Sequence, residues 1–541
     1  MTKLSVLVLI VGFLPLPTCY DSEKRGEKMA RIVTGKVYSA IADGINGERV
    51  LIEVSISPGL PSFDIIGLCD ASIRESKGRI LTAIKKSGFG IPKGHITVSI
   101  SPSFIKKTGS GFDLPIAIGV LMTAGSIPGL DSLHIFASGE LTLNGEVHGT
   151  PGAVMRISSI EKNRYDACFI PCEEKDSAAC CGQECIFVSD LRSVCGHIST
   201  YDFRSKVPQI PVFDESDNDL LDFSVLKGQE KASRSILLSA CGWHNILLIG
   251  SSGSGKTTAA KIIRGLMPSL DQKELKDVFM LNNSIGLESA ITAKSYKRPF
   301  RTVTPSLNLT GLIGNSNGFK PGEISLANHG VLFVDELCEF NTRYIDSLRI
   351  PMEDRFVVLK KGGKEMRFPS DFLFVGATNP CRCGLWLEKP NKCTCSKSVR
   401  EGYLNKISGP FADRIDLVTE MYSVDAAGLK ESVSSVNARK SRELREKVRE
   451  CWLIQKERYK GTDKPDALNG SFDSDNLSEI LRADSKVIDY ASNAASVGGY
   501  SVRSFKRLLK VGRTIADIDG RRDLRESDIA EALSYRFRCR L

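Results

Sequence analysis

The chain has 541 residues, of which 42% are hydrophobic and 25% are charged, and its formal net charge is +9. The length suggests about three or four domains. No stretch reaches the ~20 apolar residues that a membrane-spanning helix needs, so we expect no such helix. The mild positive charge permits a polyanionic partner such as nucleic acid, and a solvated basic surface accounts for it equally well.

The N-terminus begins with an apolar run, Leu4 to Pro15, that resembles the core of a signal peptide. A charged segment from Asp21 to Lys28 separates this run from a second methionine, Met29. We interpret residues 1–28 as a leader or a start assigned too far upstream, outside the fold in either case. We favour the second interpretation, with Met29 as the working start.

Residues 29–200 mix strand and helix patterns and carry no nucleotide motif. Alternating β-branched residues predict strands at 50–56 and 95–100. Apolar residues at helical spacing predict helices at 71–87 and 113–124. We therefore expect an α+β domain here, followed by a linker at 201–222, where proline, aspartate and serine are frequent.

Residues 223–420 alternate strands with helices, which predicts a parallel sheet covered on both faces. The chain is then helical and highly charged from residue 421 to 541, with amphipathic helices expected at 438–460 and 501–537. The three strands that carry motifs are expected at 245–249, 330–334 and 372–377.

The run Gly250-Ser-Ser-Gly-Ser-Gly-Lys-Thr257 fits the phosphate-loop pattern G-x-x-x-x-G-K-[ST] completely, between an expected strand and an expected helix at 257–266. The glycines let backbone N–H groups surround phosphates, and the helix N-terminus favours negative charge. Lys256 is expected to reach the β- and γ-phosphates of ATP, and Thr257 to ligate Mg²⁺. The predicted ATP-binding residues are Gly250, Ser251, Ser252, Gly253, Ser254, Gly255, Lys256, Thr257 and Thr258.

Polar side chains end the next two expected strands. Asp335 and Glu336 follow an apolar strand, and buried carboxylates at a strand end are costly unless they serve a metal or a catalytic water. Asp335 is expected to hold Mg²⁺ through its water shell, and Glu336 to orient and deprotonate the attacking water. Asn379, at the end of the third strand, is expected to sit between the γ-phosphate and this water.

Two cysteine pairs, Cys381-Arg-Cys383 and Cys393-Thr-Cys395, flank a loop that begins next to Asn379. Two such pairs close in space suit tetrahedral zinc, although C-x-C is tighter than the commoner C-x-x-C spacing. A structural zinc site and reduced thiols that ligate nothing both stay open. An ATPase indicates a reducing compartment, so we expect no disulfides.

These motifs resemble the magnesium-chelatase-like AAA+ proteins, and most closely their YifB/ComM type. The phosphate loop, the strand ending in Asp335-Glu336 and Ala377-Thr-Asn-Pro-Cys381 carry the resemblance, together with Ser408-Gly-Pro-Phe-Ala-Asp-Arg-Ile-Asp416. The likeness runs from about Ala30 to the C-terminus. One departure is that the usual Pro-His-His segment is replaced by Arg301-Thr-Val-Thr-Pro-Ser306.

The resemblance implies an α/β fold: an AAA+ P-loop core with a helical lid, preceded by an α+β domain like ribosomal S5 and Lon protease. The boundaries would be 29–200 for the S5/Lon-like domain, 201–222 for the linker, 223–420 for the core and 421–541 for the lid. The serine expected of a Lon-like peptidase is missing, since Ser110 is offset from the nucleophile position, and we expect no peptidase activity.

The resemblance also implies roles for two arginines. Arg414 resembles the arginine finger that acts on a neighbouring subunit's ATP, and Arg503 resembles the lid arginine known as sensor 2. A finger that acts on a neighbour implies a ring, and the family forms hexamers. The alternative for each arginine is a surface ion pair.

A hairpin is predicted at residues 355–368, because Gly362-Gly363 is a turn signal between two apolar segments. The resemblance places such a hairpin in the pore of the ring, where Lys360, Lys361 and Lys364 would contact phosphates of a threaded strand. The alternative is a lysine-rich edge that is simply solvated.

The resemblance implies a cytoplasmic homo-hexameric motor that needs ATP and Mg²⁺ and acts on DNA, with helicase-like branch migration in recombination or transformation. It implies no membrane partner and no small-molecule substrate other than ATP. A protein-remodelling ATPase of the magnesium-chelatase type is the main alternative, and a Lon-like peptidase is a third.

Overall fold

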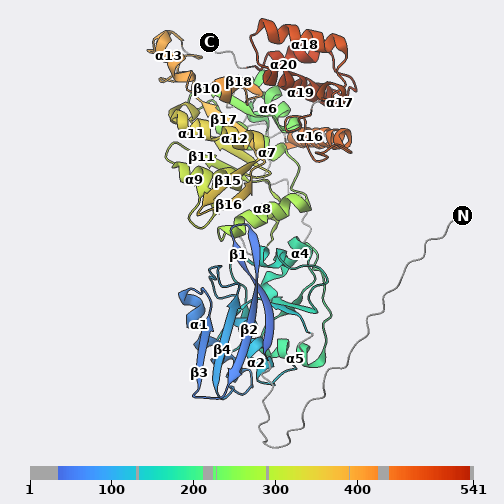
Figure 1. Cartoon of the computed structure of the whole chain (residues 1–541). Coiled ribbons are helices and arrows are strands. Elements are labelled where there is room, and N and C mark those ends of the chain that lie inside the picture. The colour runs from blue at the N-terminus through green and yellow to red at the C-terminus, as the bar shows by residue number, and fades with distance from the viewer. Residues whose placement is uncertain are drawn as a thin grey trace, which may run out of the picture.

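The computed structural model describes residues 34–128, 133–210, 223–226, 228–287, 291–388, 390–407, 409–423, 438–474 and 476–536. These residues form an elongated molecule in which an N-terminal part, a parallel-sheet part and a set of C-terminal helices follow one another (Figure 1). The predicted leader, Met29 and residues 211–222 of the predicted linker lie outside the described ranges. Within those ranges, no helix combines the length and the apolar character needed to span a bilayer.

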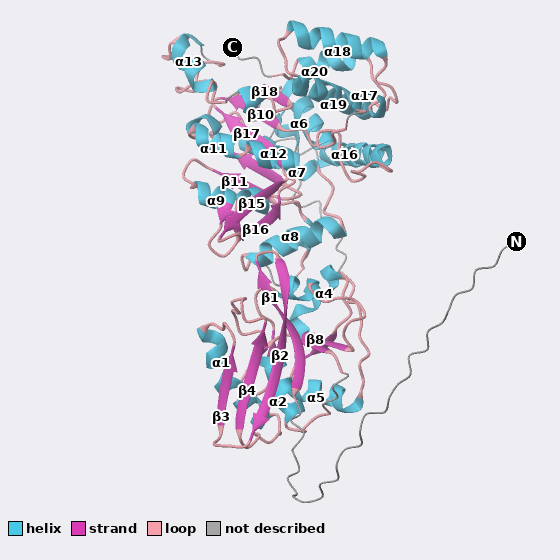
Figure 2. Ribbon diagram, viewed as in Figure 1, coloured by secondary structure: helices cyan, strands magenta, loops and turns pink. Residues whose placement is uncertain are grey.

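The N-terminal part is a seven-stranded mixed sheet in the order β3-β4-β2-β1-β5-β8-β9 (Figure 2). The strands are β1 (Gly35–Asp43), β2 (Asn46–Ser57), β3 (Ser62–Ile66), β4 (His95–Ser101), β5 (Ile135–Ala137), β8 (Ala167–Pro171) and β9 (Ile186–Val188), with a small pair formed by β6 (Glu140–Leu141) and β7 (Val147–His148). The helices are α1 (Ala71–Lys86), α2 (Asp113–Thr123), α3 (Ala153–Ser158), α4 (Lys175–Cys181) and α5 (Leu191–Thr200).

This arrangement confirms the two strands and two helices expected from the sequence. Asp70 caps the N-terminus of helix α1, because its carboxylate accepts a hydrogen bond from the N–H of Ile73. The helix buries Ile73, Ile80 and Ile84 on one side. The backbone of Lys206 bonds to that of Cys185, so the first residues of the predicted linker stay attached to this part. The likeness of this part to ribosomal S5 and Lon stays a prediction.

The second part is a five-stranded parallel sheet in the order β11-β14-β17-β10-β18. Its strands are β10 (Ile246–Gly250), β11 (Phe300–Val303), β14 (Val331–Val334), β17 (Leu373–Thr378) and β18 (Leu417–Met421). Its helices are α6 (Glu230–Gly242), α7 (Lys256–Leu266), α8 (Gln272–Ser284), α9 (Leu309–Ile313), α10 (Glu323–Leu326), α11 (Thr342–Ser347), α12 (Arg349–Asp354), α13 (Lys397–Leu404) and α14 (Gly409–Ala412), with two short strands, β12 (Gly314–Asn315) and β13 (Lys320–Pro321).

The three strands expected to carry motifs are confirmed as β10, β14 and β17, and every residue in them is buried. Along β10, Ile246 and Leu248 pack in one hydrophobic cluster while Leu247 and Ile249 pack in another, so both faces of the sheet are covered. Because β17 lies between β14 and β10, the carboxyl ends of these three strands meet at one edge of the sheet. Ligands of open parallel sheets bind at this edge.

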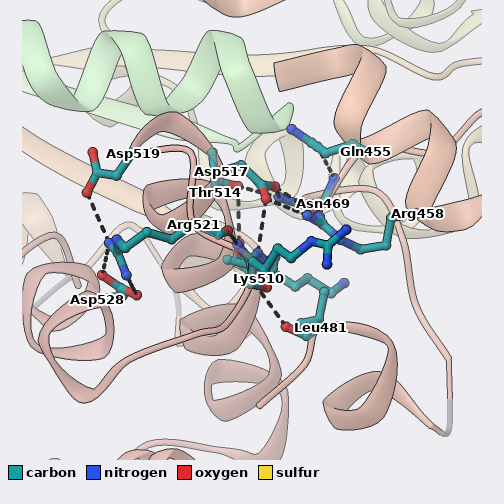
Figure 3. A network of polar contacts seen from close by, with 12 residues as sticks. Gln455, Arg458, Asn469, Leu481, Lys510, Thr514, Asp517, Asp519, Arg521 and Asp528 are labelled. Atoms are coloured by element: carbon teal, nitrogen blue, oxygen red, sulfur yellow. Dashed lines mark hydrogen bonds and ion pairs between the residues drawn. The ribbon is translucent and has the colours of Figure 1, made fainter. Parts of the chain in front are cut away.

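The third part is helical, as predicted, and consists of α16 (Ala438–Tyr459), α17 (Leu477–Ile480), α18 (Ser485–Val497), α19 (Val502–Ile518) and α20 (Glu526–Leu533). Figure 3 shows a polar network of residues from α16, α19 and α20 and from the segments between the helices. The buried Asp517 carboxylate accepts hydrogen bonds from Arg458 at 2.9 Å and Asn469 at 3.0 Å. Thr514 of α19 contacts His244 just before β10 at 2.7 Å, which ties the helices to the parallel sheet. Action of this part as a lid stays a prediction.

The N-terminal part is attached to the second part mainly through α8, which lies between the two sheets (Figure 1). Leu275 and Phe279 of α8 share a buried apolar cluster with Val154 and Met155 of α3. The N–H of Ile291 also donates to the Asp176 carboxylate of α4 at 2.9 Å. The contact therefore combines apolar burial with a directional hydrogen bond.

Candidate nucleotide-binding site

The predicted phosphate loop connects β10 to α7, and its glycines occupy positions that other residues tolerate poorly. Gly253 and Gly255 have φ angles of +83° and +87°, in the left-handed region that favours glycine. A side chain at Gly250 would place its Cβ 2.4 Å from the Met421 carbonyl oxygen of β18. Gly255 also precedes the first residue of α7, so the helix N-terminus opens directly onto the loop.

A pocket of about 350 Å³ lies at the carboxyl ends of β10, β14 and β17. It is lined by Ser252, Gly253, Gly255, Lys256, Thr257, Thr258, Asp335, Glu336, Thr378 and Asn379. Residues predicted from three separate motifs are thus brought to one place. The remaining loop residues, Gly250, Ser251 and Ser254, are buried and do not line the pocket. The roles assigned to all these residues stay predictions.

Lys256 contacts both the phosphate loop and Asn379 in this pocket. Its ammonium group donates to the carbonyl oxygens of Gly250 and Ser251, each at 2.7 Å, and lies 3.4 Å from the Asn379 side-chain oxygen. Burial lowers the pKa of Lys256, and the carboxylates of Asp335, Glu336 and Glu388 offset part of this shift. A partly desolvated ammonium group among backbone dipoles suits the binding of a phosphate.

The two acidic residues after β14 differ in exposure and conformation. Asp335 is half-buried, and its carboxylate accepts a hydrogen bond of 2.9 Å from the backbone N–H of Glu336. Glu336 is exposed and has a φ of +51°, an uncommon value for a residue other than glycine and one that is found at functional sites. The Thr257 hydroxyl and the Asp335 carboxylate line the same pocket and are oxygen donors of the kind that Mg²⁺ prefers.

The two predicted arginines lie outside the lining of this pocket and meet at one carboxylate. Arg414 is buried, pairs with Glu353, and donates to the carbonyl oxygen of Arg349 at 3.0 Å. Arg503 is exposed and pairs with the same Glu353 at 3.2 Å. Within one chain both arginines therefore form ion pairs, and the predicted actions on a neighbour's ATP and on the lid stay predictions.

The predicted hairpin is confirmed as β15 (Phe356–Lys361) paired with β16 (Lys364–Pro369). Gly362 and Gly363 have φ angles of +55° and +80°, as a tight hairpin turn requires. Lys360 pairs with Glu365 at 2.8 Å, and Lys364 pairs with Asp43 at the end of β1. The hairpin tip thus contacts the N-terminal part, and its contact with DNA stays a prediction.

The four predicted cysteines form a cluster. The sulfur atoms of Cys381, Cys383, Cys393 and Cys395 all lie within 4.8 Å of one another. Cys381 is two residues from Asn379, which lines the nucleotide pocket, while none of the four cysteines is a lining residue. Cys172 and the other cysteines of the described residues are likewise free thiols.

Sequence reasoning missed Glu388, which lies between the two cysteine pairs. Its carboxylate accepts hydrogen bonds from the Ser251 hydroxyl and from the N–H and hydroxyl of Ser423, the latter two at 2.5 and 2.8 Å. No motif signals this contact, because Glu388 stands 137 positions from Ser251 in an irregular loop. Thr378 also lines the pocket and was identifiable only as the neighbour of Asn379.

In the N-terminal part, the hydroxyl of Ser110 donates to the Glu140 carboxylate. The ammonium group of Lys107, which is fully buried, donates to the carbonyl oxygen of Pro102. The expectation of no peptidase activity stays a prediction.

Matches to known proteins extend over most of the chain. Family profiles match residues 222–429 (magnesium chelatase, subunit ChlI), 52–174 (subunit ChlI of Mg-chelatase) and 438–536 (magnesium chelatase, subunit ChlI C-terminal). The chain is 33% identical over 503 residues to the uncharacterized protein YifB of Escherichia coli (strain K12), covering 92% of this chain and 96% of that protein.

Two further relatives differ in how much of the chain they match. The competence protein ComM of Haemophilus influenzae is 31% identical over 513 residues, covering 93% of this chain and 98% of ComM. The magnesium-chelatase 38 kDa subunit of Rhodobacter capsulatus is 25% identical over 174 residues, covering 29% of this chain and 50% of that subunit. With the phosphate loop, acidic strand end and asparagine gathered in one pocket, this chain belongs to the magnesium-chelatase-like YifB/ComM family of AAA+ ATPases.

Proposed function

We propose that the chain is a ring-forming motor that hydrolyses ATP and couples hydrolysis to movement along DNA. The observation that carries the ATPase reaction is the shared pocket of Lys256, Asp335, Glu336 and Asn379. Lys256 and the loop N–H groups bind the phosphates, while Glu336 takes a proton from the attacking water that Asn379 orients. Mg²⁺, held by Thr257 and Asp335, would supply charge neutralisation on the phosphates.

The ring is proposed to be a homo-hexamer in which Arg414 of one subunit completes the site of the next. Arginine suits this role because its fixed positive charge stabilises the charge that develops on a transferred phosphoryl group. Arg503 is proposed to serve the same chemistry from the helical part, acting as a lid. Within one chain both arginines pair with Glu353, so the proposal requires each of them to leave this carboxylate for a phosphate.

DNA is the proposed substrate of the motor, with branch migration as the proposed movement. The net charge of +9 and the lysine tip of the β15–β16 hairpin support a polyanionic partner. The greater coverage of the match to ComM, which is named a competence protein, favours this proposal over a chelatase-type remodelling role. Lysines contact phosphates without reading bases, which suits a motor that tracks DNA of any sequence.

The proposal predicts that forked or four-way DNA stimulates ATP hydrolysis. Replacing Lys360, Lys361 and Lys364 by alanine should weaken DNA binding equally for all sequences and lower the salt dependence by up to ~3 units of slope. Basal turnover should persist, because the hairpin is separate from the residues that line the nucleotide pocket. Phosphate release and DNA affinity at several salt concentrations measure these effects.

The control is a variant with three exposed lysines of the N-terminal part changed to alanine: Lys85, Lys86 and Lys93. This variant loses the same charge and should keep the stimulation. If DNA fails to stimulate the wild-type ATPase, the DNA role is wrong and a protein partner becomes the better hypothesis. If both triple variants lose stimulation equally, the contact reflects overall charge rather than the hairpin.

A further inference from the structure

The loop that follows β17 folds back so that its two cysteine pairs meet. The Sγ–Sγ distances are 3.4 Å for Cys381–Cys383, 3.5 Å for Cys383–Cys393 and 3.8 Å for Cys381–Cys393. Four thiolates bound to Zn²⁺ at about 2.3 Å in a tetrahedron stand roughly 3.8 Å apart. The spacing of Cys381, Cys383 and Cys393 is therefore close to that around a single tetrahedral ion, and the Cys395 sulfur lies within 4.8 Å of the other three. All three distances are much longer than a disulfide bond.

The surroundings of the sulfur atoms also resemble those of a metal site. The backbone N–H of Trp386 is directed at the sulfur of Cys381, and the N–H groups of Leu385 and Thr394 are directed at the sulfur of Cys383. Such N–H groups stabilise thiolate ligands and fix their orientation. Cys381 is buried and the other three cysteines are half-buried, so the cluster is shielded yet open to metal entry.

The loop is held to the following helix by its own packing. The guanidinium of Arg400 in α13 stacks on the Trp386 ring, and the distance from the Arg400 Cζ atom to the ring centroid is 3.5 Å. Arg400 also donates to the carbonyl oxygen of Cys395 at 3.3 Å. Apart from these contacts the segment is irregular, and a bound ion would supply the covalent constraint that a short loop without a core lacks.

Between the two cysteine pairs, Glu388 of this loop contacts the phosphate loop. Glu388 accepts hydrogen bonds from Ser251 of the phosphate loop and from Ser423 just beyond β18. Neither Glu388 nor Ser251 is among the residues that line the nucleotide pocket. Glu388 therefore supports the loop from behind, at the point where β10 and β18 end side by side.

We propose that Cys381, Cys383, Cys393 and Cys395 bind one Zn²⁺ ion, and that this site positions Glu388 against the phosphate loop so that ATP binding depends on the metal. The second half of this inference rests on the proposed ATPase function. Glu388 is a positioning residue, because it acts on the nucleotide through Ser251. The same loop starts two residues after Asn379, so the ion also anchors the segment that holds Asn379 beside Lys256.

Metal content tests the site without any use of ATP. Wild-type protein and Cys172→Ser, which changes an exposed cysteine outside the cluster, should each carry about one zinc per chain by elemental analysis. The double variant Cys393→Ser/Cys395→Ser should carry none. Wild-type protein that is purified without chelators and contains no metal, or contains iron instead, would overturn the zinc assignment.

Nucleotide affinity tests the coupling. Glu388→Ala should keep its zinc and bind a fluorescent ATP analogue about tenfold more weakly. The reason is that Ser251 and Ser423 lose their hydrogen bonds to the Glu388 carboxylate. Glu388→Gln keeps one acceptor oxygen, which can still receive both the Ser251 hydroxyl and the Ser423 N–H that share one oxygen of Glu388, and it should retain most of the affinity. Removing zinc from the wild type with a chelator should weaken binding to the same degree, and adding Zn²⁺ back should restore it without any mutation.

Combining the changes distinguishes coupling from two separate defects. If zinc acts through Glu388, then zinc-free Glu388→Ala should bind the ATP analogue no more weakly than zinc-free wild type. Losses that multiply would overturn the coupling while leaving the zinc site intact. A wild-type protein that contains zinc but binds no ATP analogue would instead overturn the proposed ATPase function, so the two failures are distinguishable.

Discussion

At the scale of single residues, Glu353 forms ion pairs with both of the predicted catalytic arginines. Arg414 is buried against Glu353, and Arg503 reaches the same carboxylate from α19. The sequence allowed a surface ion pair as the alternative for each arginine. An ion pair is present in both cases, and Arg414 also donates to the carbonyl oxygens of Arg349 and Pro410. The proposed action on a neighbour's ATP requires these contacts to be exchanged for a phosphate.

Mixing experiments test whether Arg414 acts on a neighbour. Rings of Arg414→Ala alone and of Glu336→Gln alone should be inactive. A mixture should regain part of the activity, because some interfaces then combine an intact Glu336 with an intact Arg414. The measurement is phosphate release at several mixing ratios, with assembly confirmed by mass.

Glu353→Gln provides the matched control, because it breaks the ion pair but keeps Arg414. Near-normal activity of this variant together with rescue in the mixture would support action on a neighbour. If no mixing ratio restores activity, and Glu353→Gln is as inactive as Arg414→Ala, then Arg414 serves only the internal ion pair.

At the scale of elements, Asp416 joins three segments that meet at the start of β10. Its carboxylate accepts from the backbone N–H of Asn245 at 2.9 Å and pairs with Arg507 of α19. Burial alone would raise the pKa of Asp416, but the positive charge of Arg507 and the contact with His244 outweigh it and hold the pKa well below its usual value. The helical part is thus fastened to the parallel sheet by a buried charge pair.

Asp416→Asn should destabilise the protein by about 3–5 kcal/mol at pH 7, because Arg507 keeps its charge without a partner. The folded-state pKa lies below the unfolded value of about 3.9, so the stabilisation by Asp416 is complete above that pH and is lost as the pH falls below it. The difference in unfolding midpoint between wild type and variant should therefore be constant from pH 5 to 8 and shrink below about pH 4.

Calorimetry at pH 7, 5 and 3.5 measures this difference. The exposed pair of Lys273 and Asp466 offers a control, since Asp466→Asn should change stability by less than about 1 kcal/mol at every pH. A difference for Asp416→Asn that stays constant down to pH 3.5 would show that its ionisation does not contribute.

The sequence predicted most elements because their patterns are local. The strands β10, β14 and β17 read as apolar runs, and α1 and α16 show helical spacing. Contacts made by irregular segments were not predictable in the same way. Glu388 reaches Ser251 across 137 positions, and Lys364 reaches Asp43 across 321, and neither pair leaves a periodic or motif signal in the sequence.

At the scale of the whole molecule, the parallel-sheet part that carries the nucleotide pocket contacts both other parts of the chain directly. The cysteine loop touches the phosphate loop, α19 touches the start of β10, and the hairpin tip touches β1 of the N-terminal part. Motif order alone predicted the pocket, because parallel strands bring their carboxyl ends together. The placement of the N-terminal part against α8 depends on apolar residues whose partners no pattern identifies.

The most direct measurement of the central claim is ATP turnover by Glu336→Gln. Turnover should fall at least ~100-fold, because the general base is lost, while ATP binding persists on the intact phosphate loop. Glu339→Gln, which changes an exposed acid outside the pocket lining, should hydrolyse ATP like the wild type. Near-normal phosphate release by Glu336→Gln, measured at saturating ATP with and without four-way DNA, would contradict the assignment of this pocket as the hydrolytic site.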